Sequence, residues 1–186
     1  MAGKLSVKER IVETASRLFY HQGFNSTGIN QIISEADIAI GSLYKHFKSK
    51  EDLLLYYLKQ QETEFFNNLE NFLINEQNPK GKLLKLIDYR IQLQQQSSCS
   101  GCHFIKINAE IGRKNKDVEN IVNEHKQQQR NSIHTIISSI EQNSVLNDQQ
   151  LTNMIFLMIE GAIVSSSIKG TTQDLEDIKG IIPQML

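Results

Sequence analysis

The chain has 186 residues, of which 39% are hydrophobic and 22% are charged, and its formal net charge at pH 7 is −1. This composition is typical of a globular protein with one domain or two small ones, and only two prolines and ten glycines exclude a collagen-like or proline-rich chain. No apolar run reaches the roughly 18 residues of a membrane span and the N-terminus lacks a signal-peptide pattern, so we expect a cytoplasmic protein with no membrane partner.

Nearly every periodic segment indicates a helix, because apolar residues recur at intervals of three and four rather than two. Gly23 is placed to end the first helix, and Asn78-Pro79-Lys80-Gly81 is the clearest break in the chain. The expected helices cover residues 7–21, 28–36, 40–46, 49–73, 80–96, 103–113, 117–142, 148–169 and 174–184. The predicted fold class is therefore all-α.

The segments 28–36 and 40–46 predict a helix-turn-helix, because two short helices joined by a tight turn follow a longer supporting helix. Thr27 is placed to cap the second helix with its hydroxyl, and Asp37 tolerates the left-handed backbone that such a turn needs. Residues 1–50 contain seven Lys/Arg and four acids, a net charge of +3, which leaves −4 for the rest. A small basic module on an acidic body is consistent with DNA binding.

Lys50 lies in the first turn of the next helix, for which Ser49 and Asp52 have the spacing of a capping box. A cation there opposes the helix dipole, and a bound phosphate would offset the penalty. The alternative is that Lys50 is simply solvated. The side chains expected to face outward from the third helix are those of Ile40, Gly41, Ser42, Tyr44, Lys45 and His46.

The run from Ile11 to Leu54 closely resembles the N-terminal domain of the tetracycline-repressor (TetR) family, most specifically in the stretch GSLYKHFKSKEDL. The resemblance covers about a quarter of the chain. It implies a homodimer in which an N-terminal three-helix DNA-binding domain, residues 1–48, precedes a C-terminal helical domain for effector binding and dimerisation, residues 49–186. It also implies the residues that contact DNA, which are Thr27, Gly28, Ala39, Ile40, Gly41, Ser42, Tyr44, Lys45, His46 and Lys50.

Three positions depart from the family pattern. Gly28 replaces a small hydroxyl or acidic residue, Asp37 replaces a glycine, and Ala39 replaces the usual Ser/Thr cap of the third helix. With Ile40 beside Ala39, few side-chain donors remain for the bases. We therefore expect operator choice to depend on Lys45, Ser42 and DNA shape.

The later helices carry apolar residues that form a core and, in this family, normally also enclose an apolar cavity. The candidate pocket residues, each of which has plain core packing as the alternative, are Phe65, Leu69, Leu86, Arg90, Leu93, Cys102, Phe104, Asn108, His125, Gln129, Ile133 and Met158. The expected ligand is an apolar or electrophilic small molecule. The candidate dimer-interface residues lie on helices 148–169 and 174–184 and are Met158, Gly161, Ala162, Ser165, Ile168, Leu175, Ile178 and Ile182.

The segment Cys99-Ser-Gly-Cys102-His103 has the form C-x-x-C-H. Haem attachment is disfavoured without a signal peptide, a thioredoxin-like site needs a neighbouring strand, and structural zinc needs a fourth ligand, so we expect no metal and no cofactor. One interpretation is that Cys102 packs at a helix start. The other is thiol sensing, because Gly101-Cys102 followed by Glu110 resembles a Gly-Cys branch of the family that contains electrophile sensors, although Lys106 and Asn108 depart from that branch.

The sequence as a whole predicts a repressor that binds a palindromic DNA operator as a dimer and is released by a small-molecule effector. A thiol-based sensor acting through Cys102 beside His103 is one alternative. A DNA-binding structural protein without effector control is another. The sequence contains no nucleophile–base set, glycine-rich phosphate loop or full metal set, so we do not expect an enzyme.

Overall fold

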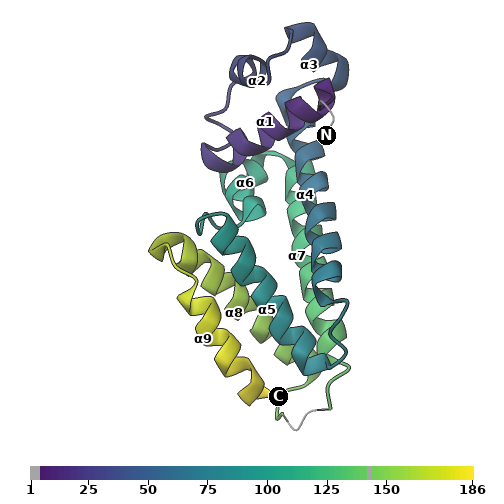
Figure 1. Cartoon of the computed structure of the whole chain (residues 1–186), viewed down its shortest axis with the longest axis vertical. Helices are drawn as coiled ribbons and strands as arrows, with labels where there is room; N and C mark the ends of the chain where they lie inside the picture. Colours follow the sequence, from purple (N-terminus) through teal and green to yellow (C-terminus); the bar gives the residue numbers. More distant parts are fainter. Residues whose placement is uncertain (1–4, 142–143) are drawn as a thin grey trace. The chain divides into compact units, whose positions relative to one another are not determined.

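A computed structural model of the chain describes residues 5–141 and 144–186 (Figure 1). Every regular element within these residues is helical, as predicted. The elements are α1 (Val7–His21), α2 (Ile29–Glu35), α3 (Ile40–His46), α4 (Lys50–Leu73), α5 (Pro79–Gln96), α6 (His103–Ile111), the 3₁₀ turn η1 (Gly112–Lys114), α7 (Lys116–Ile137), α8 (Asp148–Lys169), α9 (Gln173–Ile181) and the 3₁₀ turn η2 (Ile182–Met185).

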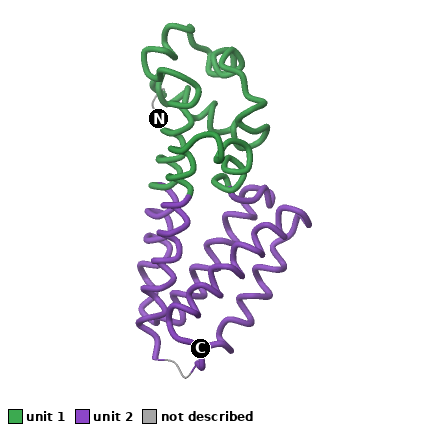
Figure 2. Tube along the Cα trace, turned by 180° about the vertical axis from the view of Figure 1, so that it is seen from behind, with its two compact units in different colours: residues 1–63, 103–122 green, residues 64–102, 123–186 purple. Residues whose placement is uncertain are grey.

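The chain divides into two compact units, coloured separately in Figure 2. Unit 1 contains residues up to 63 together with 103–122, and unit 2 contains 64–102 and 123–186. Helices α4 and α7 therefore contribute residues to both units. The predicted division at residue 48 concerns function and stays a prediction.

Unit 1 is organised around α1, which contacts α2, α3 and α6. Its first turn carries a capping box, in which Glu9 N donates to Ser6 Oγ at 3.2 Å and Ser6 N donates to the Glu9 carboxylate at 2.7 Å. Gly23, at φ +91°, reverses the chain after α1, which confirms the predicted stop. The buried apolar residues of these helices include Ile11, Ala15, Leu18, Phe19, Ile32 and Leu43.

The helix-turn-helix confirms one local prediction and corrects another. Asp37 adopts φ +51° between α2 and α3, as the turn requires. Thr27, however, does not cap α2, because Gly28 occupies the N-cap position without any side-chain bond. The buried Thr27 hydroxyl donates to Gly23 O at 2.7 Å and accepts from Gln22 Nε2 at 3.1 Å. Its side chain fastens the loop before α2 instead.

The start of α4 shows half of the predicted capping box. Asp52 N donates to Ser49 Oγ at 3.1 Å, as expected for an N-cap serine. The Asp52 carboxylate, however, accepts from Lys48 N at 2.9 Å. The reciprocal bond is therefore made one residue earlier than in a standard capping box.

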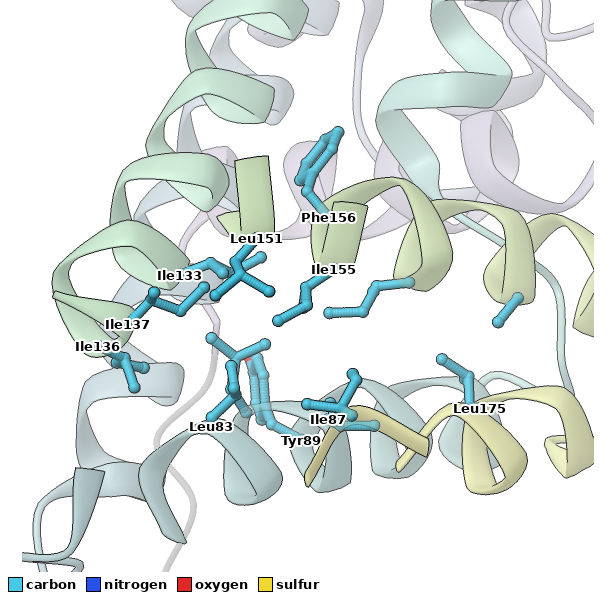
Figure 3. Packing of buried hydrophobic residues seen from close by; sticks show 14 of the residues in the cluster. Leu83, Ile87, Tyr89, Ile133, Ile136, Ile137, Leu151, Ile155, Phe156 and Leu175 are labelled. Carbon is cyan, nitrogen blue, oxygen red and sulfur yellow. The ribbon is translucent and has the colours of Figure 1, made fainter. Parts of the chain in front are cut away.

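Unit 2 has its core between α5, α7, α8 and α9. Figure 3 shows Ile133 and Ile137 of α7 close to Leu151 and Ile155 of α8, with Leu83 of α5 nearby. Helix α8 begins with a capping box between Asn147 and Gln150 and ends at Gly170, at φ +69°. Among the described residues α8 is the one helix long and apolar enough by composition to cross a membrane, and 44% of its apolar window is buried in this core.

Three predicted helix ends are too late. Helix α6 ends at Ile111 and α9 at Ile181, each followed by a 3₁₀ turn, and Pro183 has no N–H to continue the α-helical pattern. Helix α7 ends at Ile137 because Ser139 hydrogen-bonds locally, its Oγ donating to Ile136 O at 2.7 Å. The predicted end at residue 142 lies outside the described residues.

Candidate functional site

Helix α3 has one buried side and one exposed side. Leu43 is fully buried and Phe47, directly after the helix, is 3% exposed, whereas Ile40 is 56% and Tyr44 50% exposed. Gly41, Lys45 and His46 are also exposed, and Ser42 is partly so. The predicted outward residues therefore lie where an external partner can reach them. A helix of this kind, held by a supporting bundle, is the element that enters the major groove in helix-turn-helix proteins.

Gly28 and Gly41 both lie at open positions of the backbone. A Cβ atom added at either glycine would meet no other atom of the chain within 4 Å. Their small size is therefore not required by packing inside the described protein. At Gly41 in particular, it leaves room for close approach of an external backbone or base.

Lys50 is partly buried and hydrogen-bonded within the chain, so the interpretation that it is simply solvated is wrong, while its contact with DNA stays a prediction. Its Nζ donates to Phe24 O at 3.0 Å and to Thr27 O at 2.9 Å, and it lies 4.2 Å from the centre of the Phe24 ring. The ammonium thus ties the loop before α2 to the start of α4. One of its three donors remains for a phosphate.

Glu110 of α6 holds the same loop from another direction. Its carboxylate accepts from Phe24 N at 3.3 Å and from Asn25 N at 2.8 Å, and Lys106 Nζ donates to Tyr20 O at 3.2 Å. Sequence reasoning missed this role, because about 85 residues separate the partners and no local pattern joins them. The helix-turn-helix is therefore supported by a helix from the second half of unit 1.

His103, at the start of α6, is partly buried against aromatic neighbours in unit 1. Its ring stacks on Tyr20 with centres 3.7 Å apart, and its Nδ1 hydrogen-bonds to the Tyr57 hydroxyl. Burial, with smaller contributions from the positive charges of Lys106 and His21, lowers the pKa of His103 to about 4. The ring is neutral at pH 7, so it places no positive charge beside Cys102.

Unit 2 contains a narrow apolar cavity. Six of the twelve candidate pocket residues line it, namely Phe65, Leu69, Leu86, Arg90, Gln129 and Ile133. Four further lining residues were missed, Tyr89, Ser132, Phe156 and Ile159, although Ser132 follows Gln129 at helical spacing. The space open to a water-sized sphere is about 10 Å³, close to the requirement of one water molecule. Any larger ligand must widen it.

The other candidate pocket residues lie elsewhere. His125 is buried beside the cavity, against the rings of Phe65 and Phe66, and burial lowers its pKa to about 3. Its Nε2 is 2.7 Å from Gln129 Nε2. Leu93, Met158 and Cys102 are partly buried outside the cavity lining, while Phe104 and the exposed Asn108 belong to unit 1.

Three charged side chains meet next to this cavity. Arg90 Nη2 lies 3.3 Å from Glu160 Oε1, and Lys126 Nζ lies 2.6 Å from Glu160 Oε2. Their side chains are 7%, 16% and 16% exposed for Arg90, Glu160 and Lys126 respectively. Lys126 Nζ also lies 3.5 Å from the Cys102 thiol. Because two cations share one carboxylate, this group carries a net charge of +1.

The candidate dimer-interface residues divide into two groups. Ala162, Leu175 and Ile182 are buried in the core of unit 2, so their side chains are not available to a partner, and this part of the prediction is corrected. Gly161 and Ile168 are exposed, and Met158, Ser165 and Ile178 are partly buried. An exposed apolar stripe runs along α8 and contains Met154, Leu157, Gly161, Val164 and Ile168.

The cysteine motif forms no metal site among the described residues, where no group of three His, Cys, Asp or Glu side chains could hold an ion. Cys99 and Cys102 are both free thiols, the first buried and the second partly exposed. Cys99 adopts φ +56° in the turn before α6.

Comparison with known proteins identifies the N-terminal segment. Residues 11–57 match the family of bacterial regulatory proteins described as tetR. The chain is 53% identical over 55 residues to the HTH-type transcriptional regulator YerO of Bacillus subtilis, covering 27% of this chain and 19% of YerO. It is 41% identical over 59 residues to an HTH-type transcriptional regulator of Staphylococcus aureus, covering 32% of this chain and 31% of that protein. The matches thus span less than a third of these relatives.

Solved structures resemble nearly the whole chain in fold. The TetR-family regulator SCO4454 of Streptomyces coelicolor aligns with a TM-score of 0.86 and 21% identity over 96% of this chain and 95% of its own. The reduced form of E. coli NemR aligns with a TM-score of 0.83 and 20% identity over 97% of this chain and 98% of its own. At these identities the likeness concerns the fold.

Proposed function

Because residues 11–57 belong to the tetR family of bacterial regulatory proteins, we propose that the chain is a cytoplasmic transcriptional repressor that binds a palindromic operator as a homodimer. A small-molecule effector bound in unit 2 releases it from DNA. The observation that carries this proposal is α3, whose buried side fixes it in unit 1 while Ile40, Tyr44 and Lys45 remain exposed. The proposal contains no catalytic step.

The candidate DNA-contacting residues have two proposed roles, contact with the DNA itself and support of the loop before α2. Ile40, Gly41, Tyr44, Lys45 and His46 approach the groove and its flanking phosphates from α3. Ser42 borders this surface and offers its hydroxyl, while Ala39 and Gly28 border it and contribute mainly by being small. Thr27 and Lys50 hold the loop before α2, and the remaining N–H of Lys50 reaches a phosphate.

The homodimer is proposed to form through the exposed stripe of α8. Its members follow one another at intervals of three and four residues, so they share one helix face. Two copies of this stripe would bury apolar area and bring two α3 helices to the two halves of a palindrome. Replacing Leu157 and Val164 together by glutamate should give a monomer in sedimentation velocity. A double variant that stays dimeric would move the interface elsewhere.

The test of DNA recognition is selection of duplexes from a random library with the full-length chain. We expect a palindromic sequence to emerge and its affinity to fall steeply with salt, because phosphate contacts release counterions. Lys45→Met should reduce the salt slope by about one without changing thermal stability. Binding that never distinguishes one sequence from another would replace the repressor by a structural DNA-binding protein.

Thiol sensing through Cys102 is a second candidate, favoured by the Lys126 ammonium 3.5 Å from its sulfur. A partly exposed thiol beside a cation is a typical environment for reaction with electrophiles. The test compares operator release by a mild electrophile in the wild type, Cys102→Ser and Cys99→Ser. Equal release from wild type and Cys102→Ser would remove this candidate and leave a reversibly bound effector.

A further inference from the structure

Arg90 is the unusual residue in the cavity of unit 2. It is 6% exposed, it lines the cavity, and a guanidinium has five N–H donors. Within the described residues its side chain makes one hydrogen bond, to Glu160 Oε1 at 3.3 Å, and its charged group lies 5.1 Å from the centre of the Phe65 ring. Most of the donor capacity of a buried cation is therefore unused by the protein.

Arg90 and Lys126 share a single carboxylate, that of Glu160. Glu160 is shared with Lys126, which makes the shorter contact of the two, at 2.6 Å against 3.3 Å. Burying a charge without a matching partner is costly, so the group of Arg90, Lys126 and Glu160 would gain from one additional negative charge. A carboxylate matches a guanidinium especially well, since both are planar and can form two parallel hydrogen bonds.

The other residues that line the cavity determine which kind of group the ligand carries beside its anionic group. Leu69, Leu86, Ile133, Phe156 and Ile159 present apolar surface to the cavity. These walls favour an aliphatic or aromatic body, and Gln129 and Ser132 are the uncharged polar side chains of the lining that remain beside the Arg90 guanidinium and the Tyr89 hydroxyl. Charge and lining together specify an amphipathic monoanion.

We propose that the effector cavity of unit 2 binds a small carboxylate with an apolar body, its carboxylate held by Arg90 and its body by the apolar walls. This inference rests on the function proposed above, because it names the effector class of that site. The space of about 10 Å³ in the present conformation is too small for such a molecule, so binding must displace wall side chains. Such a displacement would let binding change the conformation of the protein, because a ligand shifts a conformational equilibrium only when it binds one conformation more tightly than the other.

The experiment is calorimetry on the full-length chain without DNA, using octanoate, octanol, octylamine and acetate. Octanoate should bind at least about tenfold more tightly than each of the others, because only it carries both the charge and the body. Arg90→Met should lower the affinity for octanoate by at least about tenfold and leave the affinity for octanol unchanged. Lys179→Met is the matched control, since it removes one cation of the same unit from its ion pair with Asp88, outside the cavity.

Several outcomes would overturn the inference. These are equal binding of octanoate and octanol, acetate binding as tightly as octanoate, unchanged octanoate binding by Arg90→Met, or no binding of octanoate. If Arg90→Met does not fold, Glu160→Gln replaces it. By raising the net charge of the group, Glu160→Gln should strengthen octanoate binding, and a weakening would count against the proposal. Octanoate that binds without releasing the selected operator would refute the repressor model while leaving the site intact.

Discussion

The candidate functional groups of unit 1 lie on the surface of that unit, whereas those of unit 2 lie inside its core. In unit 1 the apolar side chains face inward and the candidate DNA-contacting side chains of α3 face outward. In unit 2 the candidate ligand-binding groups, Arg90 and Gln129, are themselves buried. Exposed residues that bind a partner can stay unchanged while the core beneath them is optimised for stability. In a cavity lined by buried polar groups, ligand binding and stability cannot be changed separately, because the same residues determine both properties.

The largest expected effect is that of pH on stability, because each unit holds a histidine that is neutral at pH 7, the partly buried His103 in unit 1 and the buried His125 in unit 2. Their pKa values are about 4 and about 3, against 6.5 for the ordinary side chain. The unfolded chain therefore takes up these protons first, so stability is full above pH 6.5 and falls as the pH falls. Protonation of each histidine should lower the free energy of unfolding by about 3 kcal/mol as the pH falls from 6.5 to 4.

Urea unfolding at several pH values measures this loss. His103→Gln and His125→Gln should each flatten the pH dependence by about half, because either substitution removes one of the two sites. A pH dependence equal in wild type and both variants would show that the burial of these rings does not control their protonation.

Removal of Glu160 tests the cost of buried charge in unit 2. Glu160→Ala leaves Arg90 and Lys126 without their shared carboxylate and should lower the free energy of unfolding by about 3–5 kcal/mol. Glu119→Ala is the control, because its ion pair with Lys116 is exposed and contributes less than about 1 kcal/mol. Denaturant melts of both variants give the comparison, and equal losses would contradict it.

Neighbouring residues of α3 separate stability from DNA binding in unit 1. Leu43→Ala should cost about 2–5 kcal/mol, since its side chain is fully buried. Tyr44→Ala, at a half-exposed position, should change stability by less than about 0.5 kcal/mol and weaken operator binding. Thermal melts and binding titrations on both proteins measure the two effects. A Tyr44→Ala protein with wild-type operator affinity would remove Tyr44 from the contact surface.

The smallest expected effect is at the turn of the helix-turn-helix. Asp37 has φ +51° and a fully exposed side chain that makes only a long 3.9 Å contact with Arg10 among the described residues, while its backbone oxygen accepts from Arg10 Nη1 at 2.9 Å. Asp37→Gly should stabilise unit 1 by up to about 1 kcal/mol, because glycine adopts this conformation without strain. Asp37→Val should destabilise it by about 1–2 kcal/mol. A reversed order in the melting temperatures would disprove this account.

The sequence predicted those features that depend on neighbouring residues. The helices, the turn at Asp37 and the exposed side of α3 follow from spacings within a few turns of chain. The bonds of Lys50 to the loop carbonyls and of Glu110 to the loop amides do not, because their partners lie about 25 and 85 residues away. For the same reason the sequence named only six of the residues that line the cavity and missed Tyr89 and Phe156. Their helices meet in the core of unit 2 without sharing any local pattern.

The contribution of α6 to unit 1 has a consequence for synthesis of the chain. The loop before α2 needs the Glu110 carboxylate for its Phe24 and Asn25 amides, and unit 1 is complete only at residue 122. Because a chain emerges from the ribosome N-terminus first, about two thirds of it must be synthesised before α6 can support the helix-turn-helix. A nascent or prematurely terminated chain therefore lacks the bonds that fix the loop before α2, and under the proposed function we expect it to bind the operator less tightly than the full-length protein.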